Sequence, residues 1–268
     1  MIQERLKALR AEMEKRGITV YVVPTADFHE SEYVGDHFKA RKFITGFTGS
    51  AGTAVITLDE AGLWTDGRYF VQAENQLKDS TVTLYRMGEE GVPTVDEFVK
   101  DRLKEGGCLG FDGRVVNGTW GGKLEKIAAE KNVSMHVTED LIDLIWEDRP
   151  ALSKQPLFIL EEKYSGKSTA DKIADLRKAM KENGADVHIL TSLYDIAWLL
   201  NIRGNDIDYV PVVLSYLVLN ETECIWFLQE EVVDDKIRAY LEENHITTKP
   251  YDAIYDYVPE IPADAVVL

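Results

Sequence analysis

The residues with the clearest capacity for chemistry are Asp66 and Arg68, within the string Trp-Thr-Asp-Gly-Arg-Tyr-Phe at residues 64–70. A guanidinium is a fork-shaped donor that can bind a peptide carbonyl or a carboxylate. It can also pair with a carboxylate two residues away and do no more than fix the turn. The residue types alone leave both interpretations of Arg68 open.

A glycine-rich string at residues 46–52 precedes this turn. Its glycines recur every third residue, which matches neither the dinucleotide fingerprint nor the Walker loop, and a strand pattern follows instead of a helix. We therefore predict a tight turn with close packing, not a phosphate-binding loop. Ser50 lacks the Gly-x-Ser-x-Gly context of a hydrolase nucleophile, so we do not predict nucleophilic catalysis by this serine.

A second cluster of possible ligands lies between residues 27 and 37. Its members are Asp27, His29, Glu30, Glu32, Asp36 and His37. These side chains can bind metals, but their spacing fits no metal motif, and charged residues commonly form a solvated surface. We expect surface or intersubunit polar contacts here, with a metal site as the alternative.

The elements that position these residues follow from the hydrophobic periodicity. Apolar residues Ile2, Leu6, Leu9 and Met13 share one helical face, which ends at Gly17. Strand patterns follow at residues 19–23 and 54–58, with a hairpin turn at 59–62, and another strand pattern lies at 224–228. Thr94 and Glu97 predict a capping box at the start of a helix, and residues 123–131 predict a further helix. A similar order of helix and strand recurs 167 residues later, where the helix pattern ends at residue 184. This repeat predicts two tandem α/β domains.

A polar stretch with two prolines, at residues 149–156, separates the two halves. Proline removes a donor and restricts its predecessor, which is typical of a linker. We therefore predict a first domain at residues 1–150, a linker at 151–156 and a second domain at 157–268. Each should be a mixed sheet flanked by helices. Because the chain ends in an apolar run at residues 265–268 that has the pattern of a strand in mid-course, we expect the second domain to be truncated.

The composition excludes several classes of partner. Lysine and arginine number 30 against 47 aspartate and glutamate, a net charge of −17, which argues against nucleic acid and anionic membranes. No apolar run approaches the length of a membrane span, and no signal-peptide pattern opens the chain. Cys108 and Cys224 are far apart, as expected of reduced core thiols in a cytoplasmic protein.

Several long strings carry a family resemblance. They are the glycine-rich string with the Asp66–Arg68 turn, and the strings at residues 27–33, 141–150 and 196–204. Together they resemble the N-terminal region of the three-domain aminopeptidase P (Xaa-Pro aminopeptidase) family, which belongs with creatinases and prolidases. The resemblance spans essentially the whole chain.

This resemblance implies a ribonuclease-H-like arrangement in both domains and a substrate-binding role for Arg68. His29, Arg41, Asp66 and Tyr69 are further candidates for the same rim. The resemblance also implies that the intact enzyme is a cytoplasmic homodimer that removes the N-terminal residue from peptides with proline in second position. Its two divalent metal ions, typically manganese, would be bound in a C-terminal pita-bread domain outside this chain. We thus expect no catalytic or metal-binding residue here and no activity from this fragment alone.

Two other functions remain open from the residues. One is a stand-alone peptide- or protein-binding module without hydrolase activity. The other is a different creatinase/prolidase-type hydrolase, although two tandem domains of this kind are unusual among those relatives. Sequence beyond Leu268 would distinguish these functions. Metal ligands Asp, Asp, His, Glu and Glu there would support a hydrolase, whereas a stop codon would support the binding module.

Overall fold

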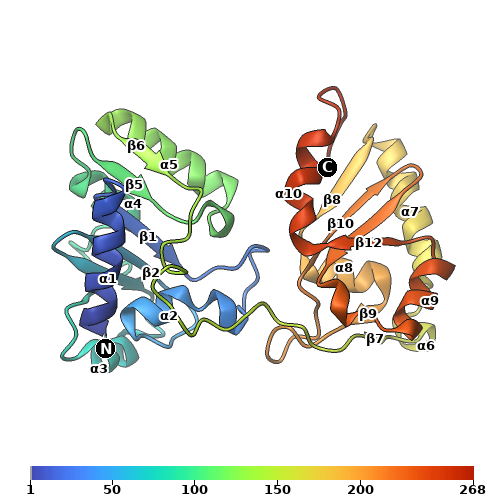
Figure 1. Ribbon diagram of the computed structural model, residues 1–268, viewed down its shortest axis with the longest axis horizontal. Coiled ribbons are helices and arrows are strands. Elements are labelled where there is room, and N and C mark those ends of the chain that lie inside the picture. Colours follow the sequence, from blue (N-terminus) through green and yellow to red (C-terminus); the bar gives the residue numbers. More distant parts are fainter. Residues whose placement is uncertain (1) are drawn as a thin grey trace. The chain divides into compact units, whose positions relative to one another are not determined.

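The computed structural model describes residues 2–268 and divides into two compact units, one ending at Ala151 and the other spanning Leu152–Leu268. Each unit is built on its own mixed sheet with helices packed against it (Figure 1). This confirms the predicted fold class of two similar mixed-sheet domains flanked by helices.

The first unit contains a six-stranded sheet in the order β4-β3-β2-β1-β5-β6. The strands are β1 (Val20–Pro24), β2 (Thr53–Thr57), β3 (Ala61–Thr65), β4 (Thr83–Arg86), β5 (Cys108–Gly110) and β6 (Ser134–His136). Only β2 runs antiparallel to the others. The C-terminal ends of β1, β3 and β5 therefore lie at one edge with the start of β2, and we call this the carboxyl edge.

Helices cover both faces of this sheet. One face packs against α1 (Ile2–Lys15), α2 (Ala40–Thr45) and α3 (Phe70–Leu77), and the other against α4 (Val95–Arg102) and α5 (Gly118–Lys131). As predicted, α1 buries Leu6, Leu9 and Met13. The predicted capping box at Thr94 is also present, since its hydroxyl accepts from Glu97 N and the Glu97 carboxylate accepts from Thr94 N. Apolar burial on both faces fixes the strand register.

The second unit repeats this order of elements. Its four-stranded sheet runs β12-β11-β10-β8. The strands are β8 (Val187–Leu190), β10 (Ser215–Asn220), β11 (Cys224–Leu228) and β12 (Thr247–Pro250), and the longer helices are α7 (Thr169–Glu182), α8 (Leu193–Leu200) and α9 (Asp235–Glu243). A small sheet of β7 (Phe158–Ile159) and β9 (Ile202–Arg203) and the short helices α6 (Glu162–Ser165) and α10 (Ile254–Tyr257) complete it.

The last residues of the chain pair with β8 in parallel. Leu268 N donates to Val187 O at 2.9 Å, and Ile189 N donates to Leu268 O at 2.9 Å. This pairing corresponds to that of β5 with β1 in the first unit. The strand orders of the two units therefore match: β12, β11, β10, β8 and the final residues correspond to β4, β3, β2, β1 and β5. The apolar run at 265–268 thus forms the strand pairing that its composition predicts.

Some predicted boundaries were wrong. Helix α5 begins at Gly118, capped by the Asn117 side chain, five residues before the predicted start at residue 123. The short strands β4, β6 and β12 were not predicted at all.

Cys108 and Cys224 are both buried and without a disulfide, as predicted. Within residues 2–268, no helix combines the length and apolar character needed to cross a bilayer.

Candidate functional site

The Asp66–Arg68 turn directly follows β3 at the carboxyl edge. The Asp66 carboxylate accepts from Arg68 Nε at 2.8 Å and from Arg68 Nη2 at 2.9 Å, and its Oδ1 also accepts from Arg68 N at 3.1 Å. This pairing lowers the pKa of Asp66 and raises that of Arg68. The ion pair considered above is therefore present, yet 70% of the Arg68 side chain is exposed. A ligand can reach the guanidinium without displacing protein atoms.

Tyr69 joins the turn to the glycine-rich string. Its hydroxyl lies 2.6 Å from Ser50 Oγ, and its ring packs edge-on against Phe47 at 5.8 Å. A Cβ on Gly49 would lie 2.2 Å from Phe47 Cζ and 2.8 Å from Tyr69 Cδ1, so only glycine allows this packing. Gly46 ends α2 with φ 77°, which also favours glycine. The string is thus a packed turn, as predicted, and Ser50 is a partner of Tyr69.

Arg41 is buried behind the glycine-rich string instead of lying on the exposed rim, where it was predicted. Its side chain is almost inaccessible, and its guanidinium donates to Thr25 Oγ1 (2.9 Å), Phe47 O (2.5 Å) and Gly49 O. Burial lowers the pKa of Arg41 to about 10. Arg41 therefore holds the loop that carries Ser50 and supports Tyr69.

The cluster at residues 27–37 is only partly the solvated surface we expected. Asp27 and His29 are buried, because the Asp27 carboxylate turns inward and accepts from His29 N and Ser31 N, both at 2.9 Å. Its other oxygen, Oδ2, has no hydrogen-bond partner. His29 is thus held beneath the surface, while Glu30 and Glu32 are both exposed.

The loop at residues 27–33 lies close enough to Arg68 for the two to interact electrostatically. The pKa of Arg68 is raised mainly by Asp66, and the negative charge of Glu32 contributes to the same shift. Because the loop follows β1 and the turn follows β3, sheet topology brings both to the carboxyl edge. Ligands of open α/β sheets commonly bind outside the carboxyl ends of the strands.

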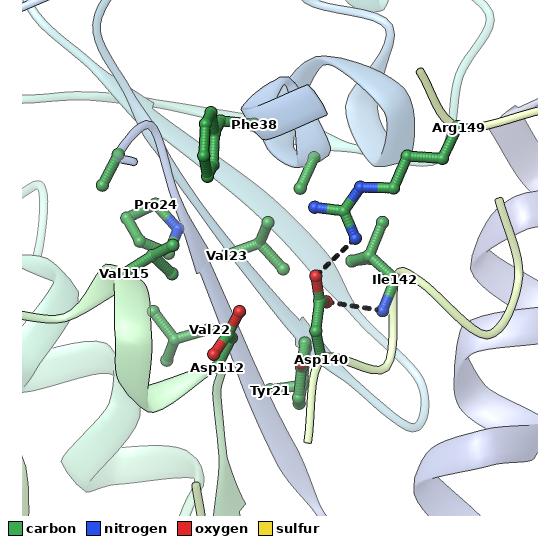
Figure 2. A pocket seen from close by; sticks show the side chains of 12 residues that line it. Tyr21, Val22, Val23, Pro24, Phe38, Asp112, Val115, Asp140, Ile142 and Arg149 are labelled. Atoms are coloured by element: carbon green, nitrogen blue, oxygen red, sulfur yellow. Dashed lines mark hydrogen bonds and ion pairs between the residues drawn. The ribbon is translucent and has the colours of Figure 1, made fainter. Parts of the chain in front are cut away.

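A buried polar cluster lies beneath this edge (Figure 2). The Asp140 carboxylate accepts from Arg149 Nη1 at 2.6 Å and from Ile142 N at 2.9 Å, and Leu141 N donates to the Tyr21 hydroxyl at 3.0 Å. These groups border a cavity of about 20 Å³, which has room for about one water molecule. Arg149 Nε also donates to His37 O at 2.9 Å. The cluster fastens residues 140–149 to the strand below.

A second Asp-Gly-Arg turn, Asp112 to Arg114, follows β5 and was not recognised in the sequence as a site. The sequence does contain a signal for this second turn, because residues 112–114 have the same Asp-Gly-Arg sequence as residues 66–68. Among residues 2–268, no group of three or more histidine, cysteine, aspartate or glutamate side chains is placed to hold a metal ion.

Comparison with known proteins identifies the class to which this fold belongs. A model of the creatinase/prolidase N-terminal domain matches residues 5–145, and a second model of the same description matches residues 148–268. The chain therefore belongs to the creatinase/prolidase N-terminal domain family and carries that domain twice.

Among more specific relatives are proteins named probable Xaa-Pro aminopeptidase P. The Neurospora crassa protein is 41% identical over 94% of this chain and 37% of its own length. The Sordaria macrospora protein is 42% identical over 94% of this chain and 41% of its own length. Arabidopsis thaliana aminopeptidase P2 is 35% identical over 98% of this chain and 38% of its own. The chain thus spans about two fifths of the length of these curated relatives.

A solved structure gives the same result. The X-prolyl aminopeptidase of Caenorhabditis elegans, described as a cytosolic enzyme with a di-nuclear active site, superposes with a TM-score of 0.91 at 34% identity. The match covers 96% of this chain and 44% of that protein. The resemblance stated from the sequence motifs is confirmed.

Proposed function

We propose that this chain is the non-catalytic N-terminal region of a metal-dependent Xaa-Pro aminopeptidase. The intact enzyme removes the N-terminal residue from peptides with proline in second position. The observation that carries this proposal is the match over 96% of the chain to an X-prolyl aminopeptidase, at a TM-score of 0.91. The exposed Arg68 supplies a donor suited to a peptide oxygen.

The proposed substrate explains why a dedicated enzyme is needed. The Xaa-Pro amide has no N–H, and the proline ring restricts the residue before it to extended conformations. Recognition must then rely on carbonyl oxygens and on the free termini of the peptide. A guanidinium fixed by a bidentate carboxylate is already oriented for such a contact, because little side-chain freedom is lost on binding.

This region has three roles in the proposal. It limits access to the active site to peptides of suitable reach, it places Arg68 against the substrate, and it supports a cytoplasmic homodimer. Two divalent metal ions, manganese by resemblance, are bound by a part of the protein outside this chain. The di-nuclear site described for the Caenorhabditis elegans enzyme supports this assignment.

The test compares the full-length product of the gene, its Arg68→Gln variant and the 268-residue chain on Xaa-Pro-Yaa peptides with added manganese. We expect activity from the full-length enzyme and none from the 268-residue chain. The Arg68→Gln variant should lose about tenfold or more in kcat/KM, because a hydrogen bond to a charged group is lost.

Arg102→Gln is the matched control, since Arg102 is also a partly exposed arginine paired with a carboxylate, Glu60. Glu60 lies in the β2–β3 hairpin, at the edge opposite the Asp66 turn. This variant should keep wild-type kinetics. Full-length protein that cleaves no Xaa-Pro peptide would contradict the proposed function and favour a binding module or another hydrolase of the superfamily.

A further inference from the structure

The first unit contains the Asp-Gly-Arg turn twice, in one geometry. At the second copy, the Asp112 carboxylate accepts from Arg114 N, Arg114 Nε and Arg114 Nη2, each at 3.0 Å. The Asp66–Arg68 copy makes the same three hydrogen bonds with the same atoms. In both copies the aspartate fixes the plane of the guanidinium through the same two nitrogens.

Both turns lie at the carboxyl edge. One follows β3 and the other follows β5, and these strands are parallel to each other with β2 and β1 between them. Three strand spacings of about 4.8 Å place the turns about 14 Å apart. An extended peptide advances about 3.3 Å per residue, so about four residues span this distance.

The two arginines are both accessible, but their carboxylate partners differ. The Arg114 side chain is 44% exposed, and it lies over the Phe28 ring at 4.6 Å. Asp112 is almost fully buried, whereas Asp66 is 36% exposed. The Asp112 pair is therefore the more rigid of the two, which lowers the entropy cost of using Arg114 as a binding group.

The charge around Arg114 indicates what it can bind. Its own partner Asp112 neutralises it, and Glu30, which is bonded to Asn117, adds negative charge on the neighbouring loop. A second carboxylate would meet repulsion here, but a carbonyl oxygen is a neutral acceptor. The edge thus suits the backbone of an extended peptide.

We propose that Arg114 is a second peptide-binding arginine, which binds a backbone carbonyl oxygen about four residues further along the peptide than the one bound by Arg68. The assignment rests on the proposed function for its substrate class. It gives the carboxyl edge a length-dependent role, because short peptides reach only Arg68 and longer ones reach both arginines.

The test is a peptide ladder, Ala-Pro-Ala(n) with n from 1 to 7, cleaved by the full-length enzyme. Arg68→Gln should lower kcat/KM at every length. Arg114→Gln should leave kcat/KM for the shortest peptides unchanged. It should lower kcat/KM about fivefold to tenfold only for peptides that extend about four residues beyond the residue bound by Arg68. Arg114→Lys should recover part of this loss, and Arg102→Gln should change nothing.

Amidated peptides identify the oxygen. If the effect of Arg114→Gln persists on amidation, an internal carbonyl is bound, as proposed. If amidation abolishes it, the group bound is the terminal carboxylate and the backbone assignment is overturned. An equal loss at all lengths would show a purely structural role, because weakening the Asp112 turn does not depend on the substrate. No loss at any length would also overturn the proposal.

A binding experiment separates this proposal from the proposed function. In the 268-residue chain, the Nε–Hε NMR signals of Arg68 and Arg114 can be followed while Ala-Pro-Ala or Ala-Pro-Ala(6) is added. The long peptide should shift both signals, and the short one only that of Arg68. This result would stand even if the full-length protein cleaved no Xaa-Pro bond. An Arg114 signal unmoved by the long peptide would overturn the proposal although the enzyme were active.

Discussion

Arg41 and Arg68 show how burial assigns one residue type to two tasks. Arg68 is paired with a carboxylate and exposed, so it can bind a partner from solution. Arg41 is buried and donates to the backbone of the glycine-rich string. Sequence motifs identify both as arginines near one rim, but only three-dimensional packing distinguishes the binding group from the one that holds the loop.

Replacement of Arg41 by methionine should destabilise the first unit. Phe47 O and Gly49 O would lose their donor, and an unsatisfied buried acceptor costs about 1–3 kcal/mol. We expect the free energy of unfolding to fall by about 2–4 kcal/mol, measured by urea denaturation. The free energy of unfolding of the Arg41→Lys variant should lie between those of the wild type and the methionine variant, because an ammonium keeps the charge but lacks the planar fork. A methionine variant as stable as the wild type would show that the loop does not need this clamp.

The sequence motifs could group the candidate site residues, but they could not indicate how deep each residue lies. Asp66, Arg68 and Tyr69 were named from one motif, and the structure places them together on one turn. Asp27 and His29 were expected near a solvated face, yet an inward-turned carboxylate buries them. Local turns of this kind depend on backbone hydrogen bonds, which leave no periodic pattern in the sequence.

At the scale of elements, the segment from residue 140 to 150 acts as a strap over the first unit. Arg149 donates to Asp140 and to His37 O, and His37 Nδ1 lies 2.8 Å from Pro150 O. Two hydrogen bonds in opposite directions thus join η1 (Asp36–Phe38) to the end of the unit. The strap fixes where the chain leaves the first unit.

This strap makes stability depend on pH. Burial lowers the pKa of His37, an effect that the Pro150 carbonyl opposes and the nearby Arg149 charge reinforces. Below its ordinary pKa of about 6.5, the unfolded chain binds a proton on His37 that the folded chain binds less readily. The free energy of unfolding should therefore decrease as the pH falls from about 7 to 5.

Urea denaturation across this pH range checks the prediction, with His37→Gln as the comparison. Glutamine can still donate to Pro150 O but does not titrate, so its stability should depend less on pH. The remaining histidines are common to both proteins and cancel in the difference. Equal slopes for the two proteins would exclude His37 as the source.

The elements themselves were predictable in proportion to their length and burial. Helix α1 and strands β2 and β11 have clear apolar patterns and agree with the prediction. Strands β4, β6 and β12 have three or four residues each, lie at or near sheet edges and are largely polar. Their position depends on pairing with a neighbouring strand, a non-local interaction that single-sequence patterns do not contain.

At the scale of the whole chain, each unit has a hydrophobic core of its own. The cores of the first unit are drawn from residues before Ala151, and that of the second from residues after it. A domain with its own core can fold alone. We expect residues 1–151 to give a dispersed ¹⁵N–¹H spectrum and a single cooperative unfolding transition.

The control for this experiment is a shorter piece, residues 1–131, which lacks β6 and the strap. It should be destabilised or unfolded, because Leu141 and Ile142 belong to the core. If residues 1–151 were unfolded as well, the first unit would depend on the second. A chain of residues 1–131 as stable as residues 1–151 would show that the strap contributes little.

The matching strand order of the two units has an evolutionary consequence. Copying one ancestral gene segment in tandem would leave this correspondence, in which β3 is the counterpart of β11 and the Asp66–Arg68 turn the counterpart of residues 229–231. Those residues are Gln229, Glu230 and Glu231, so the second copy has acid where the first has arginine. The two units therefore differ in charge at this position, as paralogous halves of a single polypeptide would after they diverge.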